Sequence, residues 1–78
     1  MIIQIFSQVL RELRTSKGIS QERLAEYCDL DRTYISLLER GLRQPSLSTI
    51  FKIAESLDMP ASEIIKTVED RMGEKKSK

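Results

Sequence analysis

Hydrophobic positions along the chain recur with the spacing of amphipathic helices. Between residues 5 and 17 they follow the i, i+3, i+4, i+7 order that lines one face of a helix, at Phe6, Val9, Leu10 and Leu13. Gly18 follows directly, and glycine is the residue that most readily takes the left-handed conformation after a helix. This pattern predicts a first helix over residues 5–17.

The next two predicted helices are short and lie close together. Ser20 is placed to cap a helix over residues 21–28, whose buried face would be Leu24, Ala25 and Cys28. The polar segment 29–31 interrupts the pattern, and Asp31 is a second capping residue. A third helix is therefore expected to begin at Arg32 and to end at Gly41.

Two further helices complete the chain. Pro45 interrupts the sequence, Ser46 or Ser48 can cap a fourth helix that extends to Leu57, and Pro60 suits the first turn of a fifth over residues 61–72. Connections this short make consecutive helices spatial neighbours. We therefore predict an all-α, compact five-helix domain over residues 1–72, followed by a flexible basic tail over residues 73–78.

The composition agrees with this fold and excludes several kinds of functional site. The chain has no histidine and one cysteine, Cys28, so it cannot supply a multidentate zinc or haem site or an internal disulfide, and a reducing cytoplasm is expected. No glycine-rich phosphate loop or nucleophile motif is present. We expect no metal, no cofactor and no enzymatic activity. The apolar start of the chain is broken by Gln4, so neither a signal peptide nor a membrane span is predicted.

The segment 21–40 fits a helix-turn-helix, in which the second helix enters the major groove of DNA. Ala25 is small where the two helices must approach closely, and the outward face of the third predicted helix is polar. The formal net charge of +1 favours neither a DNA partner nor its absence, so the arrangement of charge has to decide.

The residues that follow this template resemble a known family. Gly18-Ile19-Ser20-Gln21-Glu22-Arg23-Leu24-Ala25, then Leu30-Asp31-Arg32-Thr33-Tyr34-Ile35-Ser36, and then Glu39-Arg40-Gly41, Arg43 and Pro45-Ser46 together resemble the phage-repressor-like helix-turn-helix family. Within it, the chain is most similar to the controller proteins of bacterial restriction-modification systems. The resemblance covers residues 6–65.

This resemblance implies a lambda-repressor-like homodimer that binds double-stranded DNA at a two-fold symmetric operator. It further implies control of the protein's own gene and of a neighbouring endonuclease gene, with RNA polymerase as an additional partner. One position departs from the family, because Asp29 replaces the usual glycine of the turn. Aspartate tolerates the left-handed conformation better than most residues, so we expect the turn to persist with about 1 kcal/mol of strain.

Three residues of the third predicted helix are candidates to read bases. Arg32 in its first turn can reach a guanine edge with two donors, Thr33 can contact a base or a thymine methyl, and Ser36 can donate to a base or a phosphate. The alternative for Arg32 is a surface ion pair with Asp31 or Glu22. The alternative for Thr33 and Ser36 is solvated surface.

A second group is expected to contact the DNA backbone. Tyr34 can bury its ring and extend its hydroxyl to a phosphate; the alternative is a core tyrosine with a solvated tip, and both can hold together. Gln21 begins the helix whose first amides favour a phosphate. The remaining candidates follow the third predicted helix and are Arg40, Arg43 and Gln44. Arg14 and Glu39, by contrast, are implied by the resemblance to form an internal ion pair between the first and third helices.

The last two predicted helices carry more apolar residues than one small core needs. We predict that some form a self-complementary dimer interface, at Leu47, Ile50, Phe51, Ile65 and Val68. The alternative is that all of them are internal. A phage-type repressor or an antitoxin-like autoregulator is an alternative within the same class, and a helical protein-interaction module without DNA binding is the alternative from another class.

Overall fold

The computed structural model describes the backbone of residues 1–76 and the side chains of residues 1–73. Five α-helices account for most of the described chain: α1 (Ile2–Ser16), α2 (Gln21–Cys28), α3 (Arg32–Glu39), α4 (Leu47–Ser56) and α5 (Ala61–Lys76). No strand occurs in residues 1–76. The all-α, five-helix prediction is confirmed.

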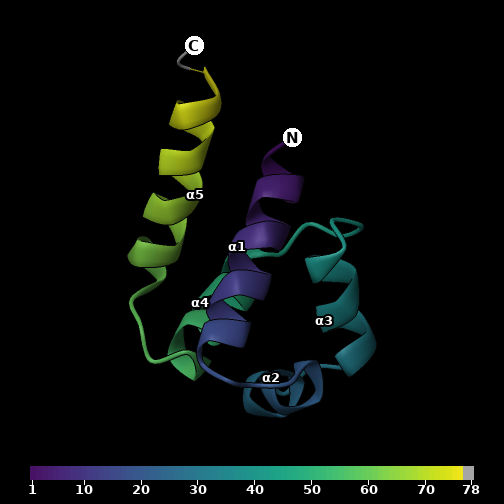
Figure 1. Ribbon diagram of the computed structural model, residues 1–78. Helices are drawn as coiled ribbons and strands as arrows, with labels where there is room; N and C mark the ends of the chain where they lie inside the picture. Colours follow the sequence, from purple (N-terminus) through teal and green to yellow (C-terminus); the bar gives the residue numbers. More distant parts are fainter. Residues whose placement is uncertain (77–78) are drawn as a thin grey trace.

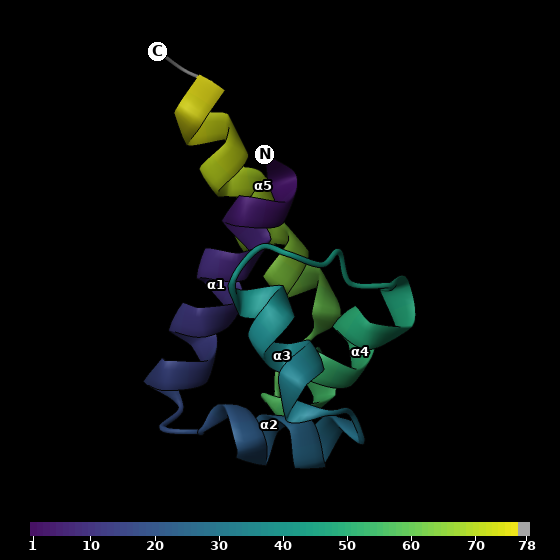
Figure 2. The ribbon, with the colours of Figure 1, turned by 90° about the vertical axis from the view of Figure 1, so that its right-hand side faces the viewer.

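α1 packs between α3 and α5, and α3 lies at an edge of the molecule. α5 lies along one side of α1 and α3 along the other, while α2 crosses the end that is remote from both termini (Figure 1). α4 packs against α2 and α5. In the view of Figure 2, α3 and the loop that follows it face the viewer, so both are accessible from outside.

The core takes apolar side chains from every helix. Leu24, Ile35, Leu38 and Ile53 are fully buried, and ten further apolar residues are almost so: Ile5, Phe6, Val9, Leu10, Ala25, Cys28, Ala54, Leu57, Ile64 and Val68. Burying a large aliphatic side chain contributes roughly 1.5–3 kcal/mol, which offsets the entropy lost when these short helices become ordered. The core therefore fixes the position of α3 relative to the other helices.

The structure agrees with some predicted helix ends and corrects others. Ser20 and Ser46 cap α2 and α4, each accepting a hydrogen bond from the backbone three residues on. Asp31 holds the N-cap position of α3, but its exposed side chain accepts no capping bond, so that prediction was wrong in its mechanism. α1 begins at Ile2, three residues earlier than expected, because the apolar run continues the helical face.

α5 is longer than the sequence indicated. It continues past Met72 to Lys76, because Gly73 takes a helical conformation there and does not end the helix. The predicted basic tail thus begins within α5. Residues 77–78 and the side chains of residues 74–76 lie outside the described part of the chain.

The turn between α2 and α3 persists with aspartate in the place of glycine. Asp29 takes the left-handed conformation, with φ 57° and ψ 46°. The turn is closed by Asp29 N–H donating to Glu26 O at 3.2 Å and Leu30 N–H donating to Ala25 O at 2.9 Å. The backbone geometry of a helix-turn-helix is therefore retained at the expense of one strained residue.

We expect Asp29→Gly to raise the free energy of unfolding by about 0.5–1 kcal/mol, because glycine removes the left-handed strain while adding some entropy to the unfolded chain. Asp29→Ala should lower it by a similar amount. Urea denaturation of the three proteins followed by circular dichroism measures both changes. Equal stability of all three would show that the turn carries no strain.

Candidate nucleic-acid interface

α3 has one face in the core and the other in solvent. Ile35, Leu38 and Glu39 are buried, whereas Arg32 and Thr33 are exposed. The 3.6-residue period separates these two sets onto opposite sides of the helix. The outward side of α3 is therefore polar and begins with a cation.

Arg32 is the first residue of α3, and its guanidinium is free to bind. None of the ion pairs in residues 1–73 includes it, so the alternative pairing with Asp31 or Glu22 is not formed. An unpaired guanidinium offers five N–H donors in a planar fork, which suits the two acceptors on the major-groove edge of guanine.

The other predicted base-reading residues lie near Arg32 on the helix. Thr33 is exposed, and Ser36, one turn after Arg32, is half-buried. Tyr34 is also half-buried and packs against the core. A single side of α3 thus presents Arg32 and Ser36, while Tyr34 packs against the core.

The loop after α3 adds a second group of exposed polar residues. Arg40, Arg43 and Gln44 are all exposed, and neither arginine forms an ion pair within the described side chains. Leu42, which the sequence analysis did not single out, is 58% exposed in the same loop. The loop therefore continues the positive charge of α3 along the molecular edge.

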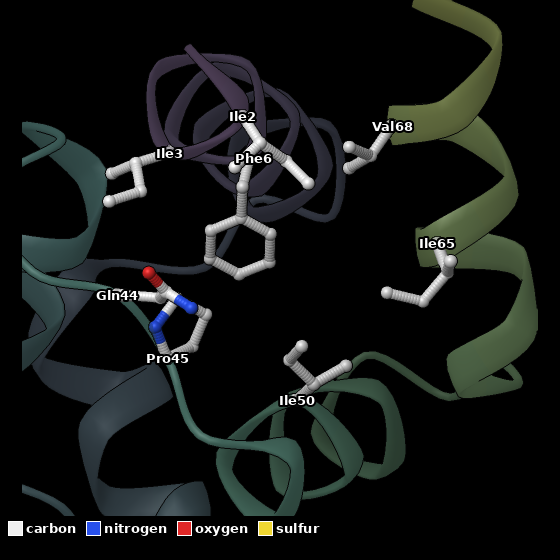
Figure 3. A pocket seen from close by; sticks show the side chains of 8 residues that line it. All are labelled: Ile2, Ile3, Phe6, Gln44, Pro45, Ile50, Ile65 and Val68. Carbon is white, nitrogen blue, oxygen red and sulfur yellow. The ribbon is translucent and has the colours of Figure 1, made fainter. Parts of the chain in front are cut away.

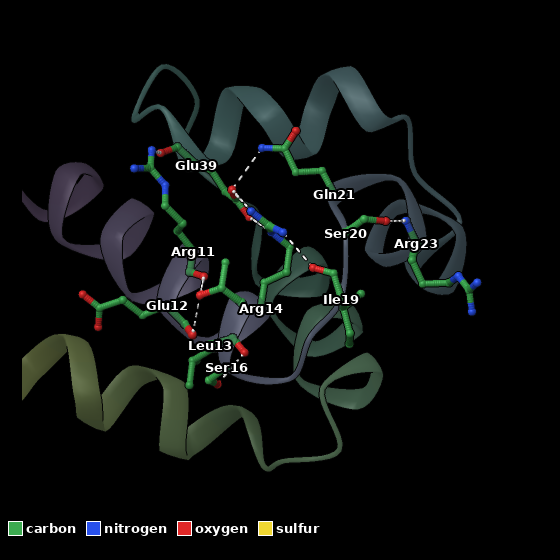
Figure 4. A network of polar contacts seen from close by, with 11 residues as sticks. Arg11, Glu12, Leu13, Arg14, Ser16, Ile19, Ser20, Gln21, Arg23 and Glu39 are labelled. Carbon is green, nitrogen blue, oxygen red and sulfur yellow. Dashed lines mark hydrogen bonds and ion pairs between the residues drawn. The ribbon is translucent and has the colours of Figure 1, made fainter.

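A buried polar network anchors α3 to α1 and to the start of α2 (Figure 4). Arg14 Nε donates to Glu39 Oε2 at 2.5 Å, Arg14 Nη2 donates to Glu39 Oε1 at 3.0 Å, and Arg14 Nη1 donates to Ile19 O at 2.7 Å. The Glu39 side chain is 1% exposed and the Arg14 side chain 13% exposed. This is the ion pair that the resemblance implied, and its geometry is bidentate.

Gln21 belongs to the same network. Its Nε2 donates to Glu39 Oε1 at 3.0 Å, a contact that the sequence analysis did not foresee. An amide nitrogen carries two hydrogens, so this bond leaves one N–H for another acceptor. Gln21 is half-buried at the first position of α2, and its side chain is oriented by Glu39.

Arg11 is a further residue that the sequence analysis missed. Its Nη2 donates to the backbone oxygen of Glu39 at 3.0 Å, so α1 contacts the last residue of α3 through two arginines (Figure 4). The sequence shows that Arg11 lies about one turn before Arg14. Its hydrogen-bond partner, however, is the backbone oxygen of Glu39, 28 residues further along the chain. No side-chain pattern indicates such a contact.

Exposed apolar side chains also occur on α4 and α5. Leu47, Phe51 and Ile65 are 70%, 58% and 44% exposed, and Ile50 is half-buried beside them. We call these four residues the α4–α5 face. Ile50 and Ile65 also line a small apolar pocket of about 110 Å³, whose wall is completed by Ile2, Ile3, Phe6, Gln44, Pro45 and Val68 (Figure 3).

The structure buries Val68, which we predicted at this surface, and exposes Ile2, which we did not. Val68 is only 5% exposed, because it packs into the core beside α1, so it contributes little area to a partner. Ile2 is 51% exposed and opens onto the same pocket, since α1 begins earlier than the periodicity indicated.

Other candidate chemistry is sparse in the described chain. Burial raises the pKa of the Cys28 thiol, whose Sγ lies 3.3 Å from Ser56 Oγ. Among the described residues, no three histidine, cysteine or acidic side chains are placed to hold a metal ion. None of the described helices is long and apolar enough to cross a bilayer.

Comparison with known proteins identifies a consistent set of relatives. Residues 10–64 match the helix-turn-helix family. The control protein C.BamHI of Bacillus amyloliquefaciens is 47% identical over 62 residues, which make up 78% of this chain and 76% of that protein.

Solved structures give the same picture. The restriction-modification controller protein C.AhdI from Aeromonas hydrophila is 50% identical with a TM-score of 0.77, and the match covers 80% of this chain and 94% of that one. The controller protein C.Esp1396I, solved as a tetramer in complex with its natural 35 base-pair operator, is 30% identical with a TM-score of 0.82 over 90% and 92% of the two chains.

Proposed function

Because the chain belongs to the helix-turn-helix family and, within it, to the controller proteins of restriction-modification systems, we propose that it is a homodimeric, sequence-specific DNA-binding transcriptional regulator. It binds a two-fold symmetric operator and controls transcription of its own gene and of a neighbouring endonuclease gene. The observation that carries this proposal is the outward side of α3, which begins with the exposed, unpaired Arg32.

In this proposal α3 lies in the major groove and reads bases. Arg32 donates to a guanine edge, while Thr33 and Ser36 contact the neighbouring base pairs or a phosphate. Phosphates are bound by Gln21 at the start of α2, by the hydroxyl of Tyr34, and by Arg40, Arg43 and Gln44 beyond α3. The backbone contacts fix the register of the helix, and the base contacts provide the sequence preference.

The α4–α5 face supplies the dimer contact. Leu47, Phe51 and Ile65 expose apolar surface that a second copy would remove from water. Binding to half-sites one DNA turn apart requires a two-fold axis that sets the two copies of α3 on the same side of the dimer, about 34–36 Å from each other. Residues 1–72 act as one DNA-binding and dimerisation unit.

Coupled dimerisation makes operator occupancy rise steeply with protein concentration, because only the dimer joins two half-site interactions. Such steepness suits a regulator that delays endonuclease expression and then switches it on. Activation requires RNA polymerase as a partner. The protein acts in the cytoplasm, where its operator is located.

Footprinting on DNA upstream of the protein's own gene tests the proposal. We expect protection of two symmetric half-sites, with an affinity that falls steeply as the salt concentration rises from 50 to 200 mM. Protection without any sequence preference, or no protection at all, would contradict it. A helical interaction module that lacks DNA binding predicts the latter result.

We expect Phe51→Glu to weaken the dimer by about 30-fold or more, because a charge replaces an aromatic anchor in both copies of the interface. Sedimentation equilibrium measures the dissociation constant. Tyr27→Glu is the matched control, since Tyr27 is an aromatic residue on α2 with a similar exposure of 54% against 58%. An equal effect of the two substitutions would place the dimer interface elsewhere.

A further inference from the structure

The last turn of α3 depends on one side chain from outside the helix for its hydrogen bonds. A helix leaves its last four carbonyl oxygens without intrahelical partners. In α3 three of these accept bonds from the following loop: Arg40 N–H donates to Ser36 O, Leu42 N–H to Leu37 O and Gly41 N–H to Leu38 O. The fourth, Glu39 O, accepts instead from Arg11 Nη2 at 3.0 Å.

Arg11 also adds a positive charge at the carboxyl end of α3, next to the C-cap residue Arg40. No basic residue occurs in the last turn of α3, although a cation near the carboxyl end of a helix is stabilised by the helix dipole. None of the ion pairs within residues 1–73 includes Arg11, so no carboxylate competes for its guanidinium. Arg14 binds the carboxylate of Glu39, and Arg11 binds its carbonyl (Figure 4).

The same side of α1 also contacts the turn that follows α3. Gln4, Ser7 and Arg11 lie three and four residues apart and therefore share one side of the helix. Gly41 has φ 71°, and a Cβ at that position would lie 3.7 Å from Ser7 Oγ and 3.8 Å from Gln4 Cγ. Ser7 is itself buried and donates to Gln4 O at 2.7 Å. α1 thus hydrogen-bonds Glu39 O through Arg11 and passes close to Gly41 at Ser7 and Gln4.

We infer that Arg11 is a positioning residue for DNA recognition, which fixes the end of α3 and the start of the loop that carries Arg43 and Gln44. The inference rests on the proposed function, because the loop matters only if its residues contact DNA. Arg11 acts through the hydrogen bond to Glu39 O. It requires no contact of its own with the nucleic acid.

The test compares wild type, Arg11→Ala, Arg11→Lys and the control Lys66→Ala, which removes one positive charge from an exposed site on α5. Two quantities are measured for each: hydrogen exchange of the Arg40, Gly41 and Leu42 amides in the free protein, and affinity for the footprinted operator at several salt concentrations. We expect Arg11→Ala to speed exchange of these amides several-fold, with the α2 amides unchanged, and to weaken operator binding about 5- to 10-fold.

The salt dependence separates positioning from direct contact. A lost phosphate contact lowers the slope of log affinity against log salt by about 1, whereas lost positioning leaves that slope equal to that of the Lys66→Ala control. Arg11→Lys retains a charged donor, so it should recover most of the protection and affinity.

Unchanged exchange and affinity in Arg11→Ala would overturn the inference, and so would a reduced salt slope with normal exchange. If Arg11→Ala does not fold, Arg11→Lys carries the test. Amide exchange and operator affinity close to those of wild type would then be the supporting result. If wild type itself shows no operator preference, the proposed function fails, and the exchange data then report separately on the contact between Arg11 and Glu39.

Discussion

Arg32→Ala should abolish most of the sequence preference of this protein while leaving its fold and the proposed dimer intact. A two-donor contact to guanine contributes about 1–3 kcal/mol per half-site, which corresponds to roughly 5- to 150-fold in affinity. A dimer carries Arg32 twice, so the loss on a complete operator is larger than on a half-site. Because Arg32 is exposed and has no ion-pair partner among the described side chains, removing it breaks no ion pair within the described chain.

Titration of wild type and Arg32→Ala against operator and scrambled DNA, each at two salt concentrations, measures this effect. Operator binding should approach the affinity for scrambled DNA, which itself should change little. Lys66→Ala removes the same charge from α5 and serves as the control. If Arg32→Ala kept the wild-type ratio between operator and scrambled DNA, α3 would not be the reading element.

Glu39→Ala should lower the free energy of unfolding by about 3–5 kcal/mol, the range typical of a buried ion pair that loses one partner. The substitution leaves the half-buried guanidinium of Arg14 without its carboxylate, and it also removes the acceptor of Gln21 Nε2. The total free energy of unfolding of a small domain is only about 5–15 kcal/mol. Much of the population is therefore expected to unfold well below the wild-type transition temperature.

Urea denaturation followed by circular dichroism measures the change. Glu69→Ala, at an exposed position on α5, is the control for loss of a carboxylate. The double variant Arg14→Met with Glu39→Met should be clearly more stable than Glu39→Ala, because no uncompensated charge is buried. A loss below about 1 kcal/mol in Glu39→Ala would mean that the pair behaves like one on the surface.

The outcome at individual residues shows which parts of the site were readable in the sequence. The exposure of Arg32, Arg40 and Arg43 followed from helical periodicity and from their place beside the turn. The contact of Gln21 with Glu39 and that of Arg11 with Glu39 O did not, because each joins helices that are far apart in the chain. Val68 was assigned to the dimer surface on apolarity alone, and apolarity does not distinguish a core from an interface.

The amino-acid sequence by itself determined the five helices, the capping serines, the helix-turn-helix and the cationic start of α3, because these depend on local periodicity and on residues within one turn of each other. Tertiary structure decided the burial of Val68, the exposure of Ile2 and the three-helix network around Glu39. Those features depend on which helix faces meet in space, and packing of the whole core sets that arrangement.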